Sequence, residues 1–555
     1  MIKKIAFGIF LSIGLGVFLA WLYRSDLVLT LVSLQTTLTT TVDSNRSVPW
    51  QREQADPVED NNLPNIIFIL ADDLGYNDIS TFGGGLAGGK VKTPHIDQLA
   101  RDGAIFRQAY AGNATCAPSR AMLMTGKYPT KTGYEFTPTP SGMASVVSML
   151  GDINDDGRPP GIFDAEIESS KPPFEDQGLP SEEITIAELL QSKGYYTAHI
   201  GKWHLGRGEG MRPNDQGFVD SLLMANGLYL PEDHPDVVNA KLDFDPIDKF
   251  LWARMRYAAS FNNGGTEMFA PKGYLTDYWT DEAIQVIENN QSRPFFLYLA
   301  HWGPHTPLQA LKRDYDDVGD IKPHRLRVYA AMVRAIDRSV GKITNALKSL
   351  GLEQNTLVVF SSDNGGAGYV GLPEINAPFR GWKLTNFEGG LRAPMFLKWP
   401  AEIPPNTSID VPVAHIDVAP TLAAAAQVDV PPELELDGTD MMAFLDDPEG
   451  SKDLERTLFW QSGHYRVVRK GDWKLQVSDN PAKKWLFNLK EDPTEQNNLV
   501  ETRSEVTDEL SALLDQHASG RKQPLYPSVA QIPVTVDKTL AEKYEDTDEL
   551  IYWPN

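Results

Sequence analysis

The chain has 555 residues, 41% of them hydrophobic and 23% charged. This length predicts two to four domains with a large buried core, and the composition excludes wholesale disorder, collagen and coiled coil. Acidic residues outnumber basic ones by 75 to 51, a net charge of −24, which argues against nucleic-acid binding. The single cysteine, Cys116, excludes an intramolecular disulfide and any zinc site built on two thiolates.

The N-terminus carries an uncharged run, Ile5–Tyr23, behind two lysines. Its 19 residues are long enough to cross the core of a bilayer, and the lysines favour an N-inside orientation. A signal peptide cleaved after Ala20 is the alternative, although Phe18 then lies where a small residue is preferred. Residues 1–24 are therefore expected to be a membrane anchor or signal segment. The rest of the chain is expected to be exported, to the periplasm or the extracellular space.

A polar segment without apolar periodicity, 25–63, predicts a linker. Beyond it, four short apolar runs end in polar or ionisable residues and predict buried strands at 65–71, 195–202, 294–301 and 356–362. Helical patterns lie between them at 182–193, 277–289 and 325–350. Strands alternating with helices predict an α/β catalytic domain over 64–450, with helices on both faces of the sheet.

The pattern changes at about residue 450. Four short alternating runs, RTLFWQS, YRVVRKG, WKLQVS and KWLFNL, are separated by turn residues and predict a small antiparallel sheet. A helix over 503–518 and an acidic, proline-containing tail are expected to follow. We therefore expect a smaller C-terminal α+β subdomain and tail over 451–555.

Polar side chains follow two of the predicted strands. Asp72-Asp73 come directly after the first strand, and Asp363-Asn364 after the last. Alone, an Asp-Asp pair is more often a solvated turn or a helix cap. Because ligands bind outside the carboxyl ends of strands in such sheets, the two pairs together predict a site for Ca²⁺ or Mg²⁺, which prefer oxygen ligands.

The only cysteine begins a second candidate motif, Cys116-Ala-Pro-Ser-Arg120. Pro118 suits the first turn of a helix and Gly126 suits its end. Cys116 is then expected at a helix N-terminus, where backbone N–H groups favour an anion. The alternatives are a buried, inert thiol and a thiolate nucleophile activated by a nearby histidine.

These segments resemble the type I, formylglycine-dependent sulfatases, an arylsulfatase-like family of the alkaline phosphatase superfamily. The resemblance covers about 64–520. It rests on motifs that occur in the family's order: Asp72-Asp73-x-Gly75, Thr93-Pro94-His95-Ile96-Asp97-x-Leu99-Ala100, Cys116-x-Pro118-Ser119-Arg120, Gly201-Lys202-Trp203-His204-Leu205-Gly206, Pro304-His305-Thr306-Pro307, Ser362-Asp363-Asn364-Gly365 and Lys383-Leu-Thr-Asn-x-Glu388-Gly389-Gly390-x-Arg392. It implies an alkaline-phosphatase-like mixed sheet sandwiched by helices.

The resemblance also implies a mechanism. A formylglycine-generating enzyme would oxidise Cys116 to Cα-formylglycine, whose hydrate attacks the sulfur of a sulfate ester. The alcohol leaves, and the second hydroxyl then expels inorganic sulfate, so that one hard step becomes two. The resemblance implies that the ligands of Ca²⁺ or Mg²⁺ are Asp72, Asp73, Cys116, Asp363 and Asn364. Arg120 and Lys202 would stabilise residue 116 and the transferred charge, and His204 would be the base for the second hydroxyl. His305 and Lys383 would bind the sulfate and protonate the leaving oxygen.

The expected reaction is hydrolysis of a sulfated carbohydrate, such as a polysaccharide, or of an aryl sulfate. Two alternatives are a phosphonate monoester or phosphodiester hydrolase of the same superfamily, and an inactive membrane-tethered glycan-binding protein. Specificity is expected in the irregular segments 136–180 and 225–275 and around Asn376–Arg380. Three aromatic residues are candidates for stacking on a sugar ring or an aryl group: Tyr229, Trp279 and Trp382.

Overall fold

The computed structural model describes residues 23–52, 63–153, 156–446, 448, 450 and 454–555. The anchor or signal predicted over 1–24 lies almost entirely outside these residues. Within the described part of the chain, no helix combines the length and the apolar character needed to cross a membrane.

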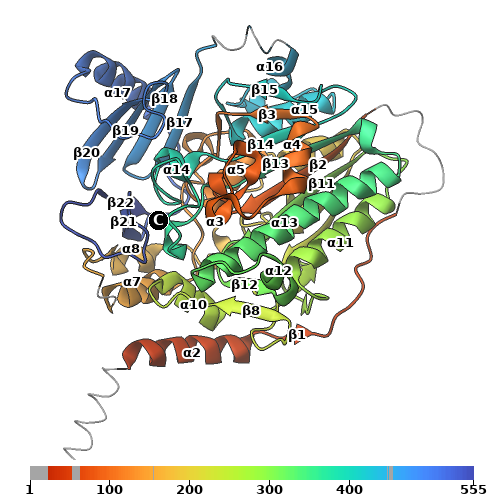
Figure 1. Cartoon of the computed structure of the whole chain (residues 1–555), viewed down its shortest axis with the longest axis horizontal. Coiled ribbons are helices and arrows are strands. Elements are labelled where there is room, and N and C mark those ends of the chain that lie inside the picture. The colour runs from red at the N-terminus through yellow and green to blue at the C-terminus, as the bar shows by residue number, and fades with distance from the viewer. Residues whose placement is uncertain (1–22, 53–62, 154–155, 447, 449, 451–453) are drawn as a thin grey trace, which may run out of the picture.

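An 11-stranded sheet runs through the catalytic domain (Figure 1). Its central strands pair in parallel, whereas β13 and β14 pair antiparallel, so the sheet is mixed. The spatial order is β1 (Val42–Asp43), β10 (Met268–Phe269), β9 (Ala259–Phe261), β7 (Asp220–Met224), β6 (Tyr196–Gly201), β11 (Phe295–Pro304), β2 (Asn65–Asp72), β13 (Thr356–Ser362), β14 (Met395–Lys398), β3 (Ala104–Phe106), β15 (Thr407–Ile409).

Helices cover both faces of this sheet, as the α/β prediction required. Alternate residues of β2 enter different cores: Ile67 packs with α4 (Pro94–Arg101), α11 (Leu275–Glu288) and α13 (His324–Ser349). On the other face, Phe68 packs with α5 (Cys116–Thr125), α9 (Ile186–Ser192) and α15 (Val418–Ala425). Because both faces are buried, the central strands are continuous apolar runs, which is why the sequence reveals them.

The other described α-helices and paired strands lie around this core. They are α3 (Leu86–Gly89), α6 (Pro129–Thr132), α7 (Met143–Ile153), α8 (Ala165–Ser170), α10 (Pro246–Arg254), α12 (Lys312–Asp317), α14 (Glu388–Leu391) and α16 (Met442–Asp446), with the strand pairs β8 (Val237–Ala240) with β12 (Leu308–Leu311) and β4 (Ala109–Tyr110) with β16 (Val413–Ala414).

The C-terminal subdomain is a four-stranded antiparallel sheet. Its strands are β17 (Thr457–Ser462), β18 (Tyr465–Lys470), β19 (Trp473–Asp479) and β20 (Ala482–Asn488). Helix α17 (Ser504–Ala518) packs Leu510 and Leu514 against one face of the sheet. The acidic tail is not a loose extension, because β21 (Ala530–Thr535) and β22 (Leu550–Pro554) form a hairpin that pairs with β5 (Ile162–Phe163) of the catalytic domain.

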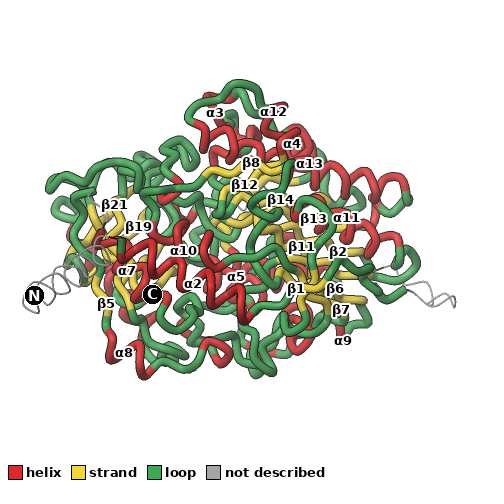
Figure 2. Tube along the Cα trace, turned by 90° about the horizontal axis from the view of Figure 1, so that it is seen from below, coloured by secondary structure: helices red, strands yellow, loops and turns green. Residues whose placement is uncertain are grey.

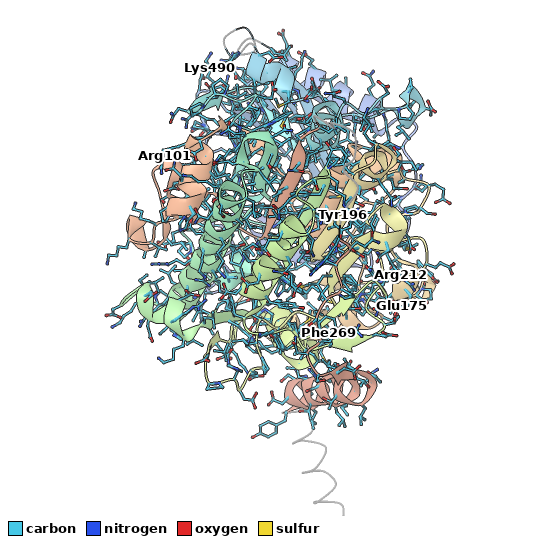
Figure 3. The ribbon with its side chains drawn as sticks, turned by 90° about the vertical axis from the view of Figure 1, so that its right-hand side faces the viewer. Arg101, Glu175, Tyr196, Arg212, Phe269 and Lys490 are labelled. Carbon is cyan, nitrogen blue, oxygen red and sulfur yellow. The ribbon has the colours of Figure 1, made fainter. Side chains whose placement is uncertain are left out.

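The linker expected over 25–63 requires a correction. Residues Arg24–Thr39 form helix α2, which lies along the edge of the molecule against α10 (Figures 1 and 3). The Arg256 guanidinium holds it by donating to the Ser33 carbonyl and the Thr37 hydroxyl, both at 2.9 Å. Its threonines conceal the helix in the sequence, but several of their hydroxyls donate to carbonyls one turn earlier.

A buried ionic network joins the C-terminal sheet to the catalytic domain. The Lys474 ammonium of β19 lies 2.8 Å from a Glu388 carboxylate oxygen and 2.9 Å from one of Glu495, and all three side chains are fully buried. Glu388 also accepts hydrogen bonds from Arg392 at 2.6 Å and from the Tyr110 hydroxyl at 2.8 Å. Two carboxylates from different parts of the chain therefore share one ammonium.

Replacing Lys474 with methionine is expected to lower the free energy of unfolding by about 3–5 kcal/mol, because two buried carboxylates lose their shared partner. Burial alone would raise the pKa of Glu388, but Lys474 and Arg392 lower it from 4.5 to about 2. The ionised Glu388 therefore adds stability above pH 4.5 that is lost as the pH falls toward 2. Denaturant unfolding should show the difference between variant and wild type shrinking over that window. The control is Lys470→Met, which removes a lysine of the same sheet that forms a solvent-exposed ion pair with Glu509. It should not change the free energy of unfolding measurably.

Candidate active site

Four neighbouring parallel strands bring the predicted residues to one edge of the sheet. In the order β6, β11, β2 and β13, their carboxyl ends lead into four groups of side chains. These are Lys202 and His204; His305; Asp72 and Asp73; and Asp363 and Asn364. This is the position at which open α/β sheets bind their ligands.

Two turns at this edge hold non-glycine residues in the left-handed backbone region. The φ angle is 62° at Asp73 and 66° at His204. Such conformations cost about 1–3 kcal/mol each and persist where neighbours hold them. The Asp73 amide donates to a carboxylate oxygen of Asp363 at 3.2 Å, and the Tyr134 hydroxyl donates to the His204 carbonyl at 3.0 Å. The turns therefore owe their shape to contacts from distant segments.

Cys116 is the first residue of α5, as predicted, and its side chain is 3% exposed. Its Sγ lies 3.5 Å from an Asp72 carboxylate oxygen and 3.7 Å from one of Asp73. Burial, with the nearby carboxylate of Asp363, raises the pKa of the Cys116 thiol well above its ordinary value. These surroundings do not activate an unmodified thiol as a thiolate.

Asp73 is the most heavily contacted carboxylate of the site. The Lys383 ammonium lies 2.9 Å from its Oδ2, the Tyr369 hydroxyl donates to Oδ2 at 2.8 Å, and the Asn364 amide donates to Oδ1 at 2.7 Å. Burial alone would raise the pKa of Asp73, but the Lys383 ammonium lowers it far below its usual range. Asp73 is therefore ionised and holds Lys383, Tyr369 and Asn364 around one carboxylate.

A second cluster surrounds Arg120, whose side chain is fully buried. Its guanidinium lies 2.8 Å from Asp363 Oδ2 and 3.4 Å from Asp72 Oδ2, and it donates to the Lys202 carbonyl at 2.9 Å. The Lys202 ammonium lies 2.7 Å from Asp72 Oδ2. Burial and the neighbouring Asp363 raise the pKa of Asp72 to about 7, although Lys202 and Arg120 oppose the shift. Three cations thus face three carboxylates in a buried site.

The donor set fits a hard divalent cation. Asp72, Asp73, Cys116 and His305 each offer one ligand atom, and these atoms all lie within 4.8 Å of one another. The buried Oδ1 of Asn364 has no hydrogen-bond partner among the described residues, so it is available as a further oxygen ligand. Carboxylate and amide oxygens suit Ca²⁺ or Mg²⁺. The proximity of His305 to the ligand atoms was not anticipated from the sequence.

The two site histidines present free ring nitrogens. His305 Nδ1 lies 2.6 Å from the Thr306 carbonyl, which can only accept, so Nδ1 carries the proton and Nε2 is unprotonated. That Nε2 lies 3.6 Å from Asp73 Oδ2. Nδ1 of His204 is buried with no hydrogen-bond partner in the described structure. Burial lowers the pKa of His305 to about 3 and that of His204 well below its ordinary value, so both rings are neutral.

The structure separates the two histidines that follow β11's apolar run. His301 Nε2 lies 2.9 Å from the Ser339 hydroxyl in the interior, whereas His305 reaches the site, as the Pro-His-x-Pro context predicts. Two residues of the site were missed in the sequence. Tyr369 lies 3.0 Å from the Lys383 ammonium, and Trp302 stacks on His305 with ring centroids 4.0 Å apart and lies under the Lys202 ammonium. Neither belongs to a recognisable motif.

A cavity of about 680 Å³ extends from this cluster. Both irregular segments expected to set specificity contribute to its walls, together with α2 and the β21–β22 hairpin. The three candidate stacking residues are not in the lining, which is a correction: Tyr229 and Trp279 are fully buried in the core and Trp382 is 6% exposed. The segment Asn376–Arg380 does not line the cavity either.

Comparisons with known proteins agree with this geometry. The family model described as Sulfatase matches residues 64–428, and that of the N-sulphoglucosamine sulphohydrolase C-terminal region matches 381–520. The N-acetylgalactosamine-6-O-sulfatase of Bacteroides thetaiotaomicron is 29% identical over 84% of this chain and 95% of its own length. The steryl-sulfatase of Homo sapiens is 30% identical over 79% of each chain.

A solved structure extends the agreement to three dimensions. Ps i-CgsB in complex with k-i-k-neocarrahexaose is 30% identical, and the alignment covers 84% of this chain and 94% of that one with a TM-score of 0.67. The family match spans more than half of the chain and includes every predicted site residue. The chain therefore belongs to the formylglycine-dependent sulfatase family, with its alkaline-phosphatase-like fold, and is a sulfatase that hydrolyses sulfate esters.

Proposed function

We propose that the chain hydrolyses sulfate monoesters through a formylglycine at position 116, with a divalent cation bound beside it. The observation that carries this proposal is the position of the Cys116 side chain. It lies at a helix N-terminus, 3.5 and 3.7 Å from two aspartates that are paired with buried cations. The overall reaction consumes one ester and one water and yields the alcohol, sulfate and a proton.

Residue 116, as the hydrated aldehyde, would supply an attacking oxygen and a second hydroxyl through which sulfate is expelled. Ca²⁺ or Mg²⁺, held by Asp72, Asp73, Asp363 and Asn364 together with residue 116, would polarise the sulfate oxygens. The hydrated aldehyde and the divalent cation are both compatible with the carboxylate and amide oxygens described above. All further steps are assigned to side chains of this chain.

The three buried cations stabilise the charge of the sulfate group. Arg120 and Lys202 lie on the Asp72 side of residue 116, and Lys383 lies on the Asp73 side. Preorganised charges in a water-excluded site lower the barrier because they need no rearrangement during reaction. The paired aspartates keep these side chains in place before substrate binds.

Proton transfer is assigned to the residues whose polar atoms border the cavity. Lys383 binds the sulfate and hands a proton to the departing alcohol oxygen, and His305 does the same once binding of the anionic ester has brought a proton to its Nε2. His204, whose Nδ1 has no partner in the described structure, takes the proton of the second hydroxyl. All three residues line the cavity together with Cys116.

The proposal is tested with the purified full chain co-expressed with a formylglycine-generating enzyme. We expect release of inorganic sulfate from 4-nitrophenyl sulfate to exceed hydrolysis of bis(4-nitrophenyl) phosphate in kcat/KM. The peptide containing residue 116 should carry an aldehyde, detected by mass and by hydrazide labelling. A higher rate on the phosphodiester would favour the phosphonate and phosphodiester alternative. Binding of sulfated glycans without any hydrolysis by aldehyde-bearing protein would favour the inactive binding protein.

We propose further that the exported enzyme is held at a membrane by its N-terminal segment. The uncharged run Ile5–Tyr23 leads directly into α2, and four leucines at spacings of four, three and four residues are exposed on that helix: Leu27, Leu31, Leu34 and Leu38, 48–77% exposed. Fractionation should recover the full chain with membranes and a chain beginning at residue 24 in the soluble fraction. Recovery of both in the soluble fraction would contradict the anchor.

A further inference from the structure

The cavity is much larger than the group that reacts in it. Its inner end is lined by Cys116, Lys202, His305 and Lys383, which the proposed function assigns to the sulfate. A volume of about 680 Å³ falls in the range of pockets that enclose a whole drug-sized ligand, far more than one sulfate needs. The remaining space therefore belongs to the alcohol part of the ester, and its walls indicate the chemistry of that alcohol.

Large apolar side chains form much of the outer wall. They come from helices α7 and α10, which pack against each other in the region that also holds α2 (Figure 2), and from nearby segments. The apolar lining includes Met143, Val147, Met224, Ile247, Phe250 and Met255. Methionines are flexible and fit irregular apolar ligands.

The apolar wall continues to the reacting end of the cavity. Met255 Sδ lies 3.0 Å from the position that a Cβ on Gly227 would occupy, and the Trp302 ring lies 3.3 Å from the same point. The Trp302 indole donates to the Gly227 carbonyl at 2.8 Å and stacks on His305. An apolar group attached to the sulfate oxygen would therefore contact protein from the first atoms outward.

Several polar side chains of the outer wall are engaged with the protein backbone. The Arg256 amide donates to Asn226 Oδ1 at 3.1 Å, and the Thr137 amide donates to Asn555 Oδ1 at 2.8 Å. Gln177 accepts from the Thr139 amide at 3.0 Å and donates to the Pro172 carbonyl at 2.8 Å.

The Arg158 guanidinium, which also lines the outer cavity, donates to carbonyls of the C-terminal tail at 3.1 and 3.3 Å. A sugar chain has to replace its bonds to water with bonds to protein, because unpaired polar groups are costly to bury. Polar groups already committed to the backbone are poorly placed to supply those bonds.

We propose that the physiological substrate is the sulfate ester of an apolar alcohol, an amphiphile whose ring system or alkyl chain occupies the outer cavity. The proposal rests on the sulfatase function above and names the substrate class of that same site. The cations bind the charged end, and the apolar wall removes the rest of the molecule from water. Binding of the apolar part persists in the transition state, so it raises kcat/KM.

The test compares 4-methylphenyl sulfate with 4-hexylphenyl sulfate, below the concentration at which the latter forms micelles. The para-alkyl chain leaves the acidity of the phenol nearly unchanged, so the two esters differ in apolar size. Each methylene that leaves water strengthens binding about fourfold, and partial burial of the five extra methylenes predicts at least a tenfold higher kcat/KM for the hexyl ester.

Two methionine variants test the site. Met255→Gln places an amide in the apolar wall and should reduce the hexyl-to-methyl ratio of kcat/KM at least threefold. Met442→Gln changes a half-buried methionine that does not line the cavity, and should leave the ratio as in the wild type. An unchanged ratio in Met255→Gln would overturn the placement of the apolar group.

A sulfated N-acetylhexosamine and a sulfated galactose oligosaccharide complete the panel. Faster sulfate release from either sugar than from the hexyl ester, or equal rates on the two aryl esters, would overturn the apolar-alcohol proposal and leave the sulfatase function standing. Failure to release sulfate from any ester by aldehyde-bearing protein would contradict the proposed function itself. The two failures are therefore distinguishable in one set of assays.

Discussion

Cys116→Ser is expected to lower steady-state sulfate release by about 10⁴-fold or more, because removing the group that forms a covalent intermediate abolishes most of the rate enhancement. A serine hydroxyl beside the same cations can still attack the sulfur. It has no second hydroxyl on its Cβ, so the sulfate remains attached. With 4-nitrophenyl sulfate, the variant should release at most one equivalent of phenol, and the peptide containing residue 116 should gain the mass of one SO₃.

Cys116→Ala is the matched control, because it preserves the helix N-terminus and removes the attacking atom. It should release no burst of phenol and gain no mass. Steady turnover by the serine variant at the wild-type rate would contradict the scheme. So would full activity in a preparation whose residue 116 is entirely unmodified thiol.

Removing the divalent cation is expected to lower kcat/KM by about 10²–10³-fold, because several kcal/mol of charge stabilisation are lost from the transition state. Added Ca²⁺ or Mg²⁺ should restore the activity. The thermal midpoint should also fall on chelation, since the ion binds the folded state and offsets repulsion among Asp72, Asp73 and Asp363. The measurement is a titration of the chelated protein with each ion, followed by activity and by thermal unfolding.

A pair of variants distinguishes ligand loss from general destabilisation. Asp72→Asn should require at least about tenfold more ion for half-maximal recovery, because a carboxylate of the donor set has become an amide. Asp78→Asn is the control: Asp78 is also fully buried, but it accepts from the Gly75 amide and the Tyr329 hydroxyl, both at 2.6 Å, outside the donor set. Its ion requirement should match the wild type. Equal requirements in Asp72→Asn and wild type would contradict the assignment of Asp72 as a ligand.

Much of the catalytic sheet could be predicted because its physical signals are local. A strand buried on both faces must be apolar along its whole length, and β2 and β13 are such runs. The parallel arrangement then places the residues after each strand at one edge, which is why Asp73 and Asp363 could be expected together. Cys116 at the start of α5 follows from a proline in the first turn and a glycine at the end.

Other features could not be predicted because they depend on contacts between distant segments. Helix α2 is held by Arg256, more than 200 residues away, and its threonine-rich sequence alone suggested a linker. Tyr369 enters the site only because the chain after β13 folds back over Asp73. The sequence suggested Trp279 as a residue that stacks on the substrate. The residue type alone, tryptophan, does not reveal that the side chain is fully buried under the sheet.

The sequence alone thus determined the family, the strands whose ends carry charged residues, and most of the charged groups around residue 116. These follow from hydrophobic periodicity and from motifs a few residues long, in which each side chain reports its own neighbourhood. Only the tertiary structure decided which ammonium faces which carboxylate, and that the cavity beyond them has an apolar wall. That wall is formed by α7, α10, the end of the chain and α2, which are distant in the sequence. Apolar surface becomes a binding site only when folding brings such segments together around a space from which water can be displaced.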